Sequence, residues 1–440
     1  MRIQPARRLR GRLRLPGDKS ISHRAAIIAA LANGRTHIEN FSTSEDCAAT
    51  LSCLAQLGVS IERDGASLLI EGVGLKGLRA PSAPLDCGNS GTTMRLLAGV
   101  LAAQGFAAVL TGDESLRSRP MRRIIEPLEL MGARISSEGG RAPLKLKGTR
   151  PLKALSYRMK VASAQVKSCI LLAGVNAAGR TEVIEEAVST RDHTERLLRW
   201  FGVPVETKIE AGANSQAVFI ENVSRLRARD LKIPGDISSA AFLMVAAAAL
   251  RGSDLEINSL GLNPTRTEII KTLQELGADV RVREDGERCN EPIGDVHVHG
   301  LESLKALRGA AGANILRGGA VARLIDELPA LAVLGTQVWG GLEIRDAQEL
   351  RVKETDRIRA MVENLRAMGA EVKEYEDGLA VTGQTALRGA RLDSYGDHRI
   401  AMAFTVAALL AEGESEIIGA ESARVSFPEF YELLESVIER

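Results

Sequence analysis

The stretch from Leu15 to Arg24, LPGDKSISHR, holds the residue types most suited to chemistry. It places Lys19, Ser20 and Arg24 directly after a Pro-Gly-Asp turn and before the apolar run AAIIAALANG. A helix start that offers hydroxyls, free backbone N–H groups and cations is suited to binding an anion. A well-capped helix with solvent-facing charges explains the same residues, so this stretch alone leaves both interpretations open.

Two further segments concentrate charge. Residues 115–123, SLRSRPMRR, form a flexible polar segment with several arginines, and residues 349–357, ELRVKETDR, precede an expected helix. In the second segment Glu354 is flanked by Lys353 and Arg357. A carboxylate among cations suits a general acid or base beside bound anions. A solvated loop is the alternative interpretation of each segment.

A histidine pair raises the question of a metal. His297 and His299 share one face of an expected strand, and such a pair can bind zinc. No further ligand is evident near them in the sequence, so we expect a surface strand and no metal site. The five cysteines show no paired spacing and no C-x-x-C, which is typical of reduced thiols in a cytoplasmic protein.

Composition limits the function classes. A chain of 440 residues is long enough for two domains or more. The net charge of +1 gives no bias toward nucleic acid or a membrane surface, and the longest apolar run, residues 240–250, is far shorter than a membrane span. The arginine-rich N-terminus lacks the apolar stretch of a signal peptide. We therefore expect a cytoplasmic protein that binds neither nucleic acid nor membrane.

The chain repeats one pattern six times. Six runs rich in Ala, Leu, Ile and Val each end in a glycine before a short strand, and these glycines are Gly34, Gly105, Gly179, Gly252, Gly341 and Gly413. The runs are apolar almost all round, which predicts buried helices whose small side chains allow close packing. Six amphipathic helices alternate with them and should lie outside, as in residues 354–369, where apolar residues follow helical spacing on one face.

The ends of the chain predict a split domain. The sixth repeat stops after its outer helix with no closing strand, while the alternating Arg and Leu of residues 9–15 predict a leftover N-terminal strand with one wet face. We expect the N-terminus to complete the last repeat. Because PGD recurs at residues 16–18 and 234–236, we predict one lobe of residues 1–17 plus 238–440 and another of 18–237. Hinge crossings near 15–20 and 234–239 would let the lobes close over a ligand.

The starts of the six apolar helices carry unlike chemistry. They are Lys19-Ser20 with Arg24, Asn89 to Thr92 with Arg95, Ser163-Ala164-Gln165, Ser238-Ser239, Asp326-Glu327 and Asp397-His398-Arg399. Ordinary helix caps explain Ser, Asn and Asp there but not Lys and Arg, because a cation at a helix N-terminus is unfavourable. We infer that the helix starts converge in each lobe and bind anions in a cleft between the lobes.

Seven motifs resemble the 3-phosphoshikimate 1-carboxyvinyltransferase (5-enolpyruvylshikimate-3-phosphate, EPSP, synthase) family. They are PGDKSISHR, GNSGTTMR, SRPM, ASAQVKS, TRDHTE, RVKETDR and GDHRIAMAF, in the family's order from residue 15 to beyond 427. The resemblance implies an α/β fold of the α+β repeat type: two lobes of three helix–sheet repeats with buried inner helices, an inverse α/β barrel. This agrees with the six repeats and the split domain.

The resemblance also implies the reaction and its residues. The family transfers the enolpyruvyl group of phosphoenolpyruvate to the 5-hydroxyl of shikimate 3-phosphate and releases phosphate, in the pathway to chorismate and aromatic amino acids. The implied catalytic residues are Asp326, as acceptor of the hydroxyl proton, and Glu354 with Lys19, for protonation and elimination. Shikimate 3-phosphate would contact Lys19, Ser20, Arg24, Ser163, Ala164, Gln165, Arg191, Asp326 and Lys353. Phosphoenolpyruvate would contact Lys19, Gly91, Arg119, Gln165, Arg357 and Arg399. No cofactor or metal is implied, and we expect a monomer.

One departure from the family pattern stands out, and one further position bears on an inhibitor. Ala164 occupies a position where the family often has Ser, so one hydroxyl contact is missing or becomes a backbone contact. Gly91 stands where family members that resist the herbicide glyphosate commonly have Ala, so we expect glyphosate to fit this protein. Two alternatives stay open: the sister enzyme that acts on UDP-N-acetylglucosamine, and an inactive anion-binding repeat protein.

Overall fold

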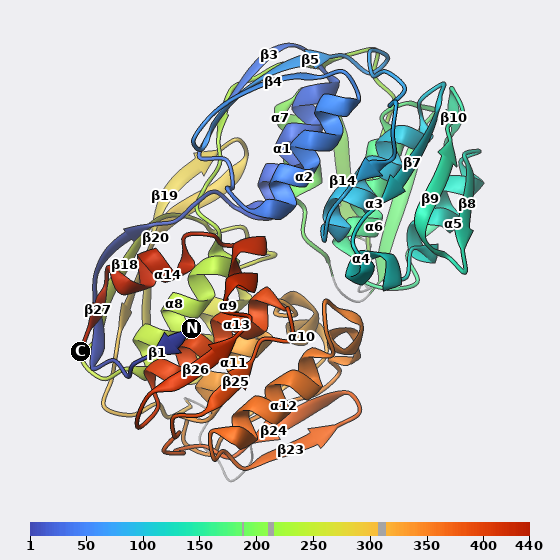
Figure 1. The fold of residues 1–440 in the computed structure, drawn as a ribbon. Helices are drawn as coiled ribbons and strands as arrows, with labels where there is room; N and C mark the ends of the chain where they lie inside the picture. The colour runs from blue at the N-terminus through green and yellow to red at the C-terminus, as the bar shows by residue number, and fades with distance from the viewer. Residues whose placement is uncertain (187–188, 210–214, 307–313) are drawn as a thin grey trace. The chain divides into compact units, whose positions relative to one another are not determined.

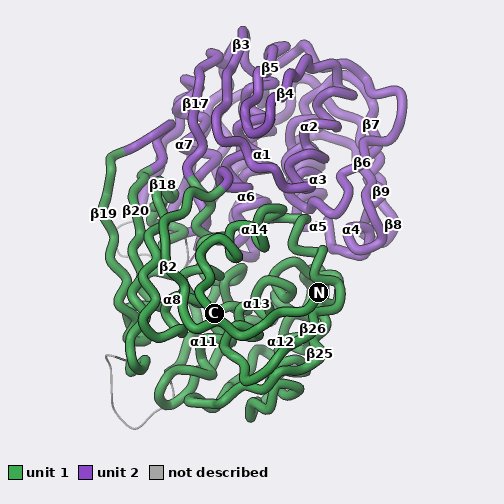
Figure 2. The backbone as a smooth tube through the Cα atoms, turned by 60° about the vertical axis from the view of Figure 1, so that its left-hand side comes forward, with its two compact units in different colours: residues 1–15, 235–286, 292–440 green, residues 16–234, 287–291 purple. Residues whose placement is uncertain are grey.

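The computed structural model describes residues 1–186, 189–209, 215–306 and 314–440 (Figure 1). They form two compact units, shown in green and purple in Figure 2. Unit 1 comprises Met1–Leu15, Gly235–Gly286 and Pro292–Arg440, and unit 2 comprises Pro16–Pro234 and Glu287–Glu291. Each unit has its own hydrophobic core.

Three buried inner helices run through each unit. Those of unit 2 are α1 (Lys19–Leu31), α3 (Gly91–Ala102) and α6 (Ala164–Gly174), and those of unit 1 are α8 (Ile237–Ala249), α11 (Leu328–Gly335) and α13 (His398–Leu409). Every residue of α8 from Ile237 to Ala248 is buried, as predicted from its all-round apolarity. The helices begin at the predicted starts. In all but α11 a side chain at the N-cap accepts a backbone N–H of the first turn.

The predicted closing glycines do not end these helices themselves. Helix α1 stops at Leu31, three residues before Gly34, and Gly34 lies within the following strand. Helix α13 stops at Leu409, and Gly413 then turns the chain with a φ of +92° that favours glycine. The glycines therefore mark the passage from helix to strand.

Small residues bring the inner helices close together, as predicted. A Cβ added at Gly99 of α3 would lie 2.2 Å from the carbonyl oxygen of Cys169 in α6. This is nearer than any real Cβ contact, so the approach of α3 to α6 requires glycine at this position.

The amphipathic helices cover the inner ones. They are α2 (Glu45–Gln56), α5 (Arg122–Leu130), α7 (His193–Trp200), α9 (Glu268–Glu275), α12 (Arg357–Ala367) and α14 (Phe430–Glu435). In α12, Ile358, Met361 and Leu365 are fully buried, whereas Arg359 is exposed, which confirms the predicted outer helix. Shorter helical turns are α4 (Glu114–Ser118), α10 (Gly319–Arg323), η1 (Gln348–Val352) and η2 (Ala420–Val425).

The repeats of unit 2 each build one small sheet with the same topology. In the second and third repeats the strand before the inner helix pairs in parallel with the strand after it, and two further strands are added by antiparallel pairing. In the first repeat the parallel partner of the strand after the inner helix is residues 226–227, from the end of the unit. The orders are β16 (Leu226–Arg227)-β3 (Ala32–Glu39)-β5 (Ser67–Val73)-β4 (Ser60–Asp64), then β6 (Leu85–Asp86)-β7 (Ala107–Thr111)-β9 (Arg141–Lys147)-β8 (Arg134–Glu138), and β11 (Ser156–Arg158)-β13 (Thr181–Glu186)-β15 (Ser215–Ile220)-β14 (Val205–Ile209). Strand β17 (Leu231–Lys232) also pairs with β3, and β10 (Leu152–Lys153) pairs with β12 (Ala177–Ala178).

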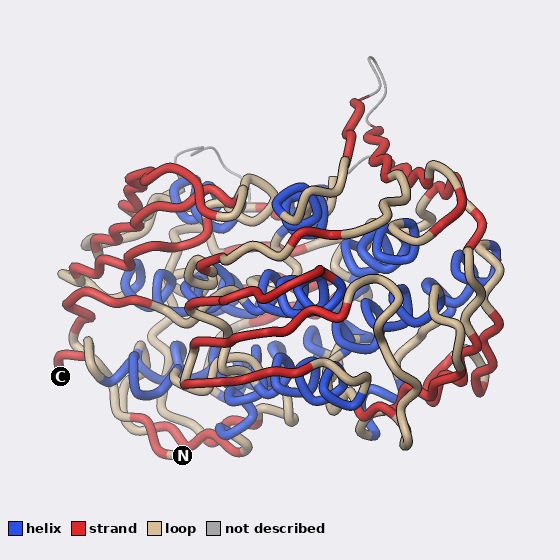
Figure 3. Tube along the Cα trace, turned by 90° about the horizontal axis from the view of Figure 1, so that it is seen from above, coloured by secondary structure: helices blue, strands red, loops and turns tan. Residues whose placement is uncertain are grey.

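In unit 1 the fifth repeat has the same strand pairing, whereas the sixth has a single antiparallel strand that comes from the N-terminus. The sheets of unit 1 have the orders β19 (Asp279–Arg288)-β20 (Glu291–His299)-β18 (Asp254–Gly261)-β2 (Arg8–Arg14)-β27 (Ile438–Glu439), then β21 (Ile315–Leu316)-β22 (Leu342–Ile344)-β24 (Gly378–Val381)-β23 (Val372–Tyr375), and β1 (Arg2–Ile3)-β26 (Ser415–Ile418)-β25 (Arg391–Asp393). Figure 3 shows the strands in red lying outside helices in blue. The protein thus has the two-lobe α/β repeat fold.

Pairing at the chain ends corrects two expectations. The N-terminus does join the sixth repeat, but through β1, where Arg2 pairs with Glu416. The Arg–Leu strand, β2, instead pairs in parallel with β18 of the fourth repeat. A strand does follow the outer helix of the sixth repeat, but this strand, β27, pairs with β2 in the sheet of the fourth repeat. Two-residue strands such as β1 and β27 are too short to show an alternating pattern, so they could not be predicted from periodicity.

The turn of the β19–β20 hairpin belongs to unit 2, although the predicted division placed it in the other lobe. Glu291 Oε1 lies 2.8 Å from Nδ1 of buried His193, and the Asn290 carbonyl accepts a 2.7 Å hydrogen bond from Arg196 Nη1. Cys289 lies in the apolar core of unit 2. Among the described residues, no helix is both long and apolar enough to cross a membrane.

Candidate active site

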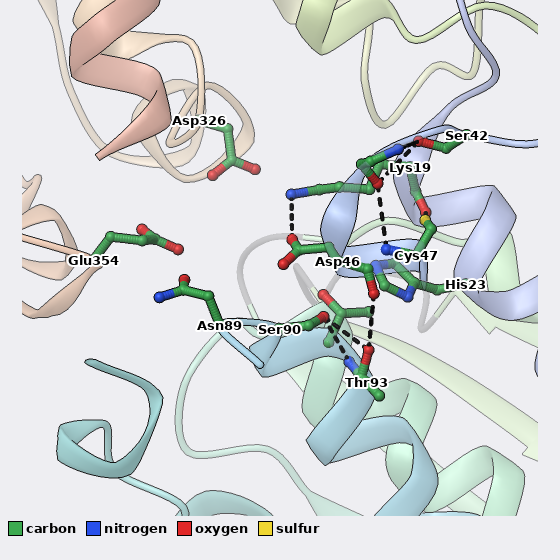
Figure 4. Close-up of polar contacts among 12 residues, drawn as sticks. Lys19, His23, Ser42, Asp46, Cys47, Asn89, Ser90, Thr93, Asp326 and Glu354 are labelled. Atoms are coloured by element: carbon green, nitrogen blue, oxygen red, sulfur yellow. Dashed lines mark hydrogen bonds and ion pairs between the residues drawn. The ribbon is translucent and has the colours of Figure 1, made fainter. Parts of the chain in front are cut away.

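Lys19 opens α1 and lies against the first turn of α2. Its Nζ forms an ion pair with Asp46 Oδ2 at 2.8 Å, and both side chains are mostly buried (Figure 4). Asp18 caps the same helix by accepting the N–H of Ile21 at 2.8 Å. The Pro-Gly-Asp turn therefore fixes the helix start, and Asp46, which the sequence did not single out, fixes the ammonium group.

A buried hydroxyl network joins α1 to α3 through α2. His23 Nδ1 lies 2.7 Å from Thr50 Oγ1, which lies 2.7 Å from Thr93 Oγ1. Thr93 Oγ1 also lies 3.3 Å from the carbonyl oxygen of Asp46 and 2.8 Å from the Oγ of Ser90, the cap of α3, so its one hydroxyl proton can be donated to either (Figure 4). Burial lowers the pKa of His23 well below its usual range, and the cations Lys19 and Arg24 add to this effect. His23 is thus a neutral, structural member of the network.

The starts of α3 and α6 meet at Gln165. Arg95 Nη1 donates to Gln165 Oε1 at 2.6 Å, and Gln165 Nε2 donates to Thr92 Oγ1 at 2.9 Å. A Cβ added at Gly91 would lie 2.6 Å from Arg95 Nη1 and 3.5 Å from Arg119 Nη1. Two of the residues predicted for phosphoenolpyruvate, Gly91 and Gln165, therefore share Arg95 as a neighbour.

Arg119 directly follows α4, where the sequence predicted a flexible polar segment. Residues 114–118 form α4 and α5 begins at Arg122, so this segment is mostly helical. Arg119 Nη2 donates to Asn89 Oδ1 at 2.7 Å and to Ser115 Oγ at 3.2 Å. Its guanidinium is thereby held beside the N-terminus of α3.

Arg24 is buried among the inner helices and α7. Its Nε donates to Thr194 Oγ1 at 2.7 Å, Nη2 to Ser168 Oγ at 2.9 Å, and Nη1 to the Ser20 carbonyl at 2.8 Å. Burial, with the nearby charge of Arg191, lowers the pKa of Arg24 to about 10. Arg24 therefore ties α1 to α6 and α7 and places a positive charge near Arg191.

Three further predicted residues lie at helix starts of unit 2. Ser20 is in the first turn of α1, Ser163 caps α6 by accepting the N–H of Val166 at 3.4 Å, and Ala164 is the first residue of α6. All three are half-buried. Since Ala164 has no hydroxyl, only its backbone N–H, at the positive end of α6, is available to an anion.

The predicted residues of unit 1 centre on Arg357, the first residue of α12. Arg357 is 1% exposed, and its Nε donates to Asp397 Oδ2 at 2.8 Å. Its Nη2 donates to Glu354 Oε2 at 2.6 Å, and Nη1 lies 3.8 Å from Asp326 Oδ1. Burial opposes the charge, but the carboxylates of Asp397 and Glu354 raise the pKa of Arg357 above its usual value. The two predicted acid–base residues thus flank one permanent cation.

Arg399 joins the three inner-helix starts of unit 1. Its Nη1 donates to Ser238 Oγ at 2.7 Å, and Ser238 Oγ donates to Glu327 Oε1. Glu327 also pairs with buried Arg266 at 3.5 Å. Among the described residues, Nε of Arg399 and Nη1 of Arg357 have no hydrogen-bond partner. Both N–H groups can therefore donate to an anion.

Lys353 lies in the segment between η1 and α12, beside the same charges. Burial lowers its pKa, and the charge of Arg357 acts in the same direction, whereas the Asp326 carboxylate raises it. Lys353 is thus electrostatically coupled to both the predicted base and the predicted anion-binding arginine.

Comparison with known proteins places the chain in a family. The family model for EPSP synthase (3-phosphoshikimate 1-carboxyvinyltransferase) matches residues 3–434. The chain belongs to the EPSP synthase family. It is 48% identical over 443 residues to the 3-phosphoshikimate 1-carboxyvinyltransferase of Koribacter versatilis, a match that covers 100% of this chain and 99% of the relative. The corresponding enzyme of Salinibacter ruber is 49% identical over 440 residues, with 99% and 98% covered. The solved EPSP synthase of Acinetobacter baumannii has a TM-score of 0.86 at 42% identity and covers 99% of this chain and 98% of its own.

Sequence reasoning missed the partners that hold the EPSP synthase motif residues in place. Asp46 pairs with Lys19, Asn89 with Arg119, and Asp397 with Arg357. Asn89 and Asp397 stand at helix starts inside the quoted motifs, so the sequence predicted them as helix caps. Their second role, as partners of Arg119 and Arg357, could not be predicted from the sequence. Asp46 carries no signal beyond a helix start at Ser44-Glu45, because its pairing depends on how α2 packs against α1.

Proposed function

We propose that this protein transfers the enolpyruvyl group of phosphoenolpyruvate to the 5-hydroxyl of shikimate 3-phosphate and releases phosphate. The observation that carries the proposal is the Arg357 cluster. There Glu354 lies 2.6 Å and Asp326 3.8 Å from one buried guanidinium. The match to the family model over residues 3–434 supports the assignment of this cluster to the enolpyruvyl transfer reaction.

The proposed chemistry needs an acid and a base. A proton added to the methylene carbon of phosphoenolpyruvate makes the neighbouring carbon electrophilic, and the substrate hydroxyl oxygen then bonds to that carbon. Asp326 would accept the hydroxyl proton. Glu354, with Lys19, would supply the methylene proton and later remove one, so that phosphate leaves and the double bond forms again.

The cations would stabilise the anionic groups of both substrates and of the tetrahedral intermediate. For phosphoenolpyruvate we propose Lys19, Gly91, Arg119, Gln165, Arg357 and Arg399, and for shikimate 3-phosphate Lys19, Ser20, Arg24, Ser163, Ala164, Gln165, Arg191, Asp326 and Lys353. Among the described residues, Arg357 Nη1 and Arg399 Nε have no hydrogen-bond partner, which supports their assignment to an anion. Since each substrate supplies its own leaving group or nucleophile, the reaction requires no cofactor.

We further propose that the enzyme is a cytoplasmic monomer that binds only small-molecule substrates and no nucleic acid or membrane. The formal charge of +1 and the free, buried cysteines support this proposal. Hinge crossings near 15–20 and 234–239 stay predictions. Size-exclusion chromatography with light scattering tests the monomer, and a dimer mass would refute it.

The test of function is phosphate release from phosphoenolpyruvate. We expect release with shikimate 3-phosphate and none with UDP-N-acetylglucosamine. Release only with the nucleotide sugar would assign the sister reaction. Silence with both substrates, in folded protein, would favour an inactive anion-binding protein.

The residue roles need their own variants. We expect Asp326→Ala and Glu354→Gln each to reduce kcat by about 10²-fold or more, the usual contribution of a general acid or base. Asp64→Asn, on exposed β4, is a matched control that should keep full activity. Turnover of Asp326→Ala equal to that of the wild type would remove the base assignment.

A further inference from the structure

Three ligand-type side chains gather on the solvent face of the β2–β18–β20 sheet in unit 1. Asp254 of β18 stands directly opposite His299 of β20, and Glu256 stands opposite His297. Because side chains two residues apart point to the same face of a strand, all four lie on one face. None of them is among the residues proposed for the reaction.

Two imidazoles approach one carboxylate oxygen. His297 Nε2 lies 2.6 Å and His299 Nδ1 3.7 Å from Asp254 Oδ1, and the two rings lie 4.5 Å apart, centroid to centroid. One nitrogen of each histidine and a carboxylate oxygen lie within 4.8 Å of one another. The expectation that this histidine pair has no further ligand nearby is therefore wrong. Asp254 is 43 residues away along the chain and is brought in by strand pairing.

A single hydrogen bond does not account for the whole arrangement. It explains His297, which is hydrogen-bonded to Asp254. His299 Nδ1 lies within ion-pair distance of the same oxygen but beyond hydrogen-bonding distance. Tetrahedral zinc, with ligand bonds of about 2.0–2.1 Å, holds its ligand atoms about 3.4 Å apart. The observed distances from Asp254 Oδ1, 2.6 Å to His297 and 3.7 Å to His299, lie on either side of that spacing.

The surroundings decide what kind of site this is. Arg10 and Arg12 of β2 lie beside Asp254 and Glu256, and Arg12 pairs with Glu256 at 2.8 Å. Arg10 adds positive charge that weakens the attraction for a cation. The three ligand side chains are 37–44% exposed, so an ion can enter and water can complete its coordination. Two imidazoles and a carboxylate are the ligand set of an open zinc site.

We propose that Asp254, His297 and His299 bind a divalent transition-metal ion, Zn²⁺ in the first instance, with water in the remaining position. The ion joins β18 to β20 and so stabilises unit 1 when it binds.

The test is calorimetric titration of the chelator-treated full-length protein with Zn²⁺. We expect the wild type to bind one ion per chain. The affinity for Zn²⁺ should be lower by about tenfold or more in each of Asp254→Asn, His297→Gln and His299→Gln, since even the loss of a group that supports a ligand lowers metal affinity by about that factor. His37→Gln and Glu256→Gln are controls. His37 is a single half-buried histidine on β3, and Glu256 shares the face without being a ligand. Both should bind like the wild type.

Thermal unfolding gives a second readout that does not depend on activity. At one Zn²⁺ concentration, the melting temperature of the wild type should rise more than that of His299→Gln. The His299 side chain is 40% exposed, so it can be replaced without unfolding the protein. No binding by the wild type would overturn the proposal. Equal binding by the wild type and any of the three ligand variants would overturn it as well.

Discussion

A buried lysine offers the sharpest test of the physical reasoning. Lys167 in α6 is fully buried, and its Nζ lies 2.8 Å from Glu185 Oε2 and 2.7 Å from Glu195 Oε1. It also donates to the Thr190 carbonyl at 3.2 Å, next to Arg191. Burial disfavours the charged form of Lys167, but the two carboxylates outweigh burial and raise the pKa of Lys167. For Glu195 the balance is reversed: burial raises its pKa, and the charge of Lys167 only partly opposes this. One cation thus compensates two buried carboxylates.

We predict that Lys167→Met destabilises unit 2 by about 3–5 kcal/mol, the usual cost of removing one partner from a buried ion pair. The loss should grow with pH. Without the lysine, the folded-state pKa of Glu195, which burial already raises, should rise further above the unfolded value of about 4.3. A raised carboxyl pKa stabilises the fold only below that unfolded value, and the stability is lost as pH rises through the folded pKa. The extra loss is at most about 1.4 kcal/mol per pH unit for each proton.

Urea unfolding at pH 5.5, 6.5 and 7.5, followed by the fluorescence of Trp200, measures this effect. Trp200 ends α7, the helix that carries Glu195, and Trp339→Phe removes the other tryptophan, which lies in unit 1. Lys160→Met, on the surface of unit 2, is the matched control and should unfold like the wild type. Adding Glu195→Gln to Lys167→Met should restore part of the stability and flatten the pH dependence. A penalty below about 1 kcal/mol, or one independent of pH, would refute the reasoning.

Three further predictions follow from other buried groups. Burial lowers the pKa of His23, so below pH 6.5 the unfolded chain takes up a proton that the folded protein excludes. The free energy of unfolding of the wild type should therefore fall by up to about 1.4 kcal/mol per pH unit below pH 6.5. In urea titrations His23→Gln should lack this loss, and equal pH dependence of the unfolding free energy in both proteins would contradict the prediction. Gly91→Ala should displace Arg95, because Arg95 Nη1 is 2.6 Å from the added Cβ. The KM for phosphoenolpyruvate should then rise about tenfold and glyphosate inhibition should weaken, since a charged hydrogen bond contributes about 1.5–3 kcal/mol. Equal glyphosate inhibition constants for Gly91→Ala and the wild type would refute the role of Gly91. Asp397→Asn should lower the melting temperature and raise the same KM, because it removes the charge paired with buried Arg357, and an unchanged KM would contradict that pairing role.

The sequence predicted those parts of the fold that depend on local interactions. The all-round apolarity of residues 237–250 is sufficient to predict a buried helix, and the spacing of Ile358, Met361 and Leu365 to predict a covering one. Ser, Asp and Asn at the helix starts predict caps, because a cap involves residues only two or three apart. Repetition of these signals predicted six repeats, and the motifs PGDKSISHR and RVKETDR predicted the family.

Tertiary structure decided how those residues are partnered. Lys19 meets Asp46, Arg399 meets Ser238, and Asp254 meets His299, across separations of 27, 161 and 45 residues. These contacts depend on strand register and helix packing, and a local sequence pattern specifies neither. The same limit explains why β1 and β27 were missed and why the turn at Glu287–Glu291 was placed in the wrong unit. The sequence by itself therefore determined which of the longer elements form and which residues carry charge. Only the fold decided which charges are paired and buried, because that depends on contacts between distant parts of the chain.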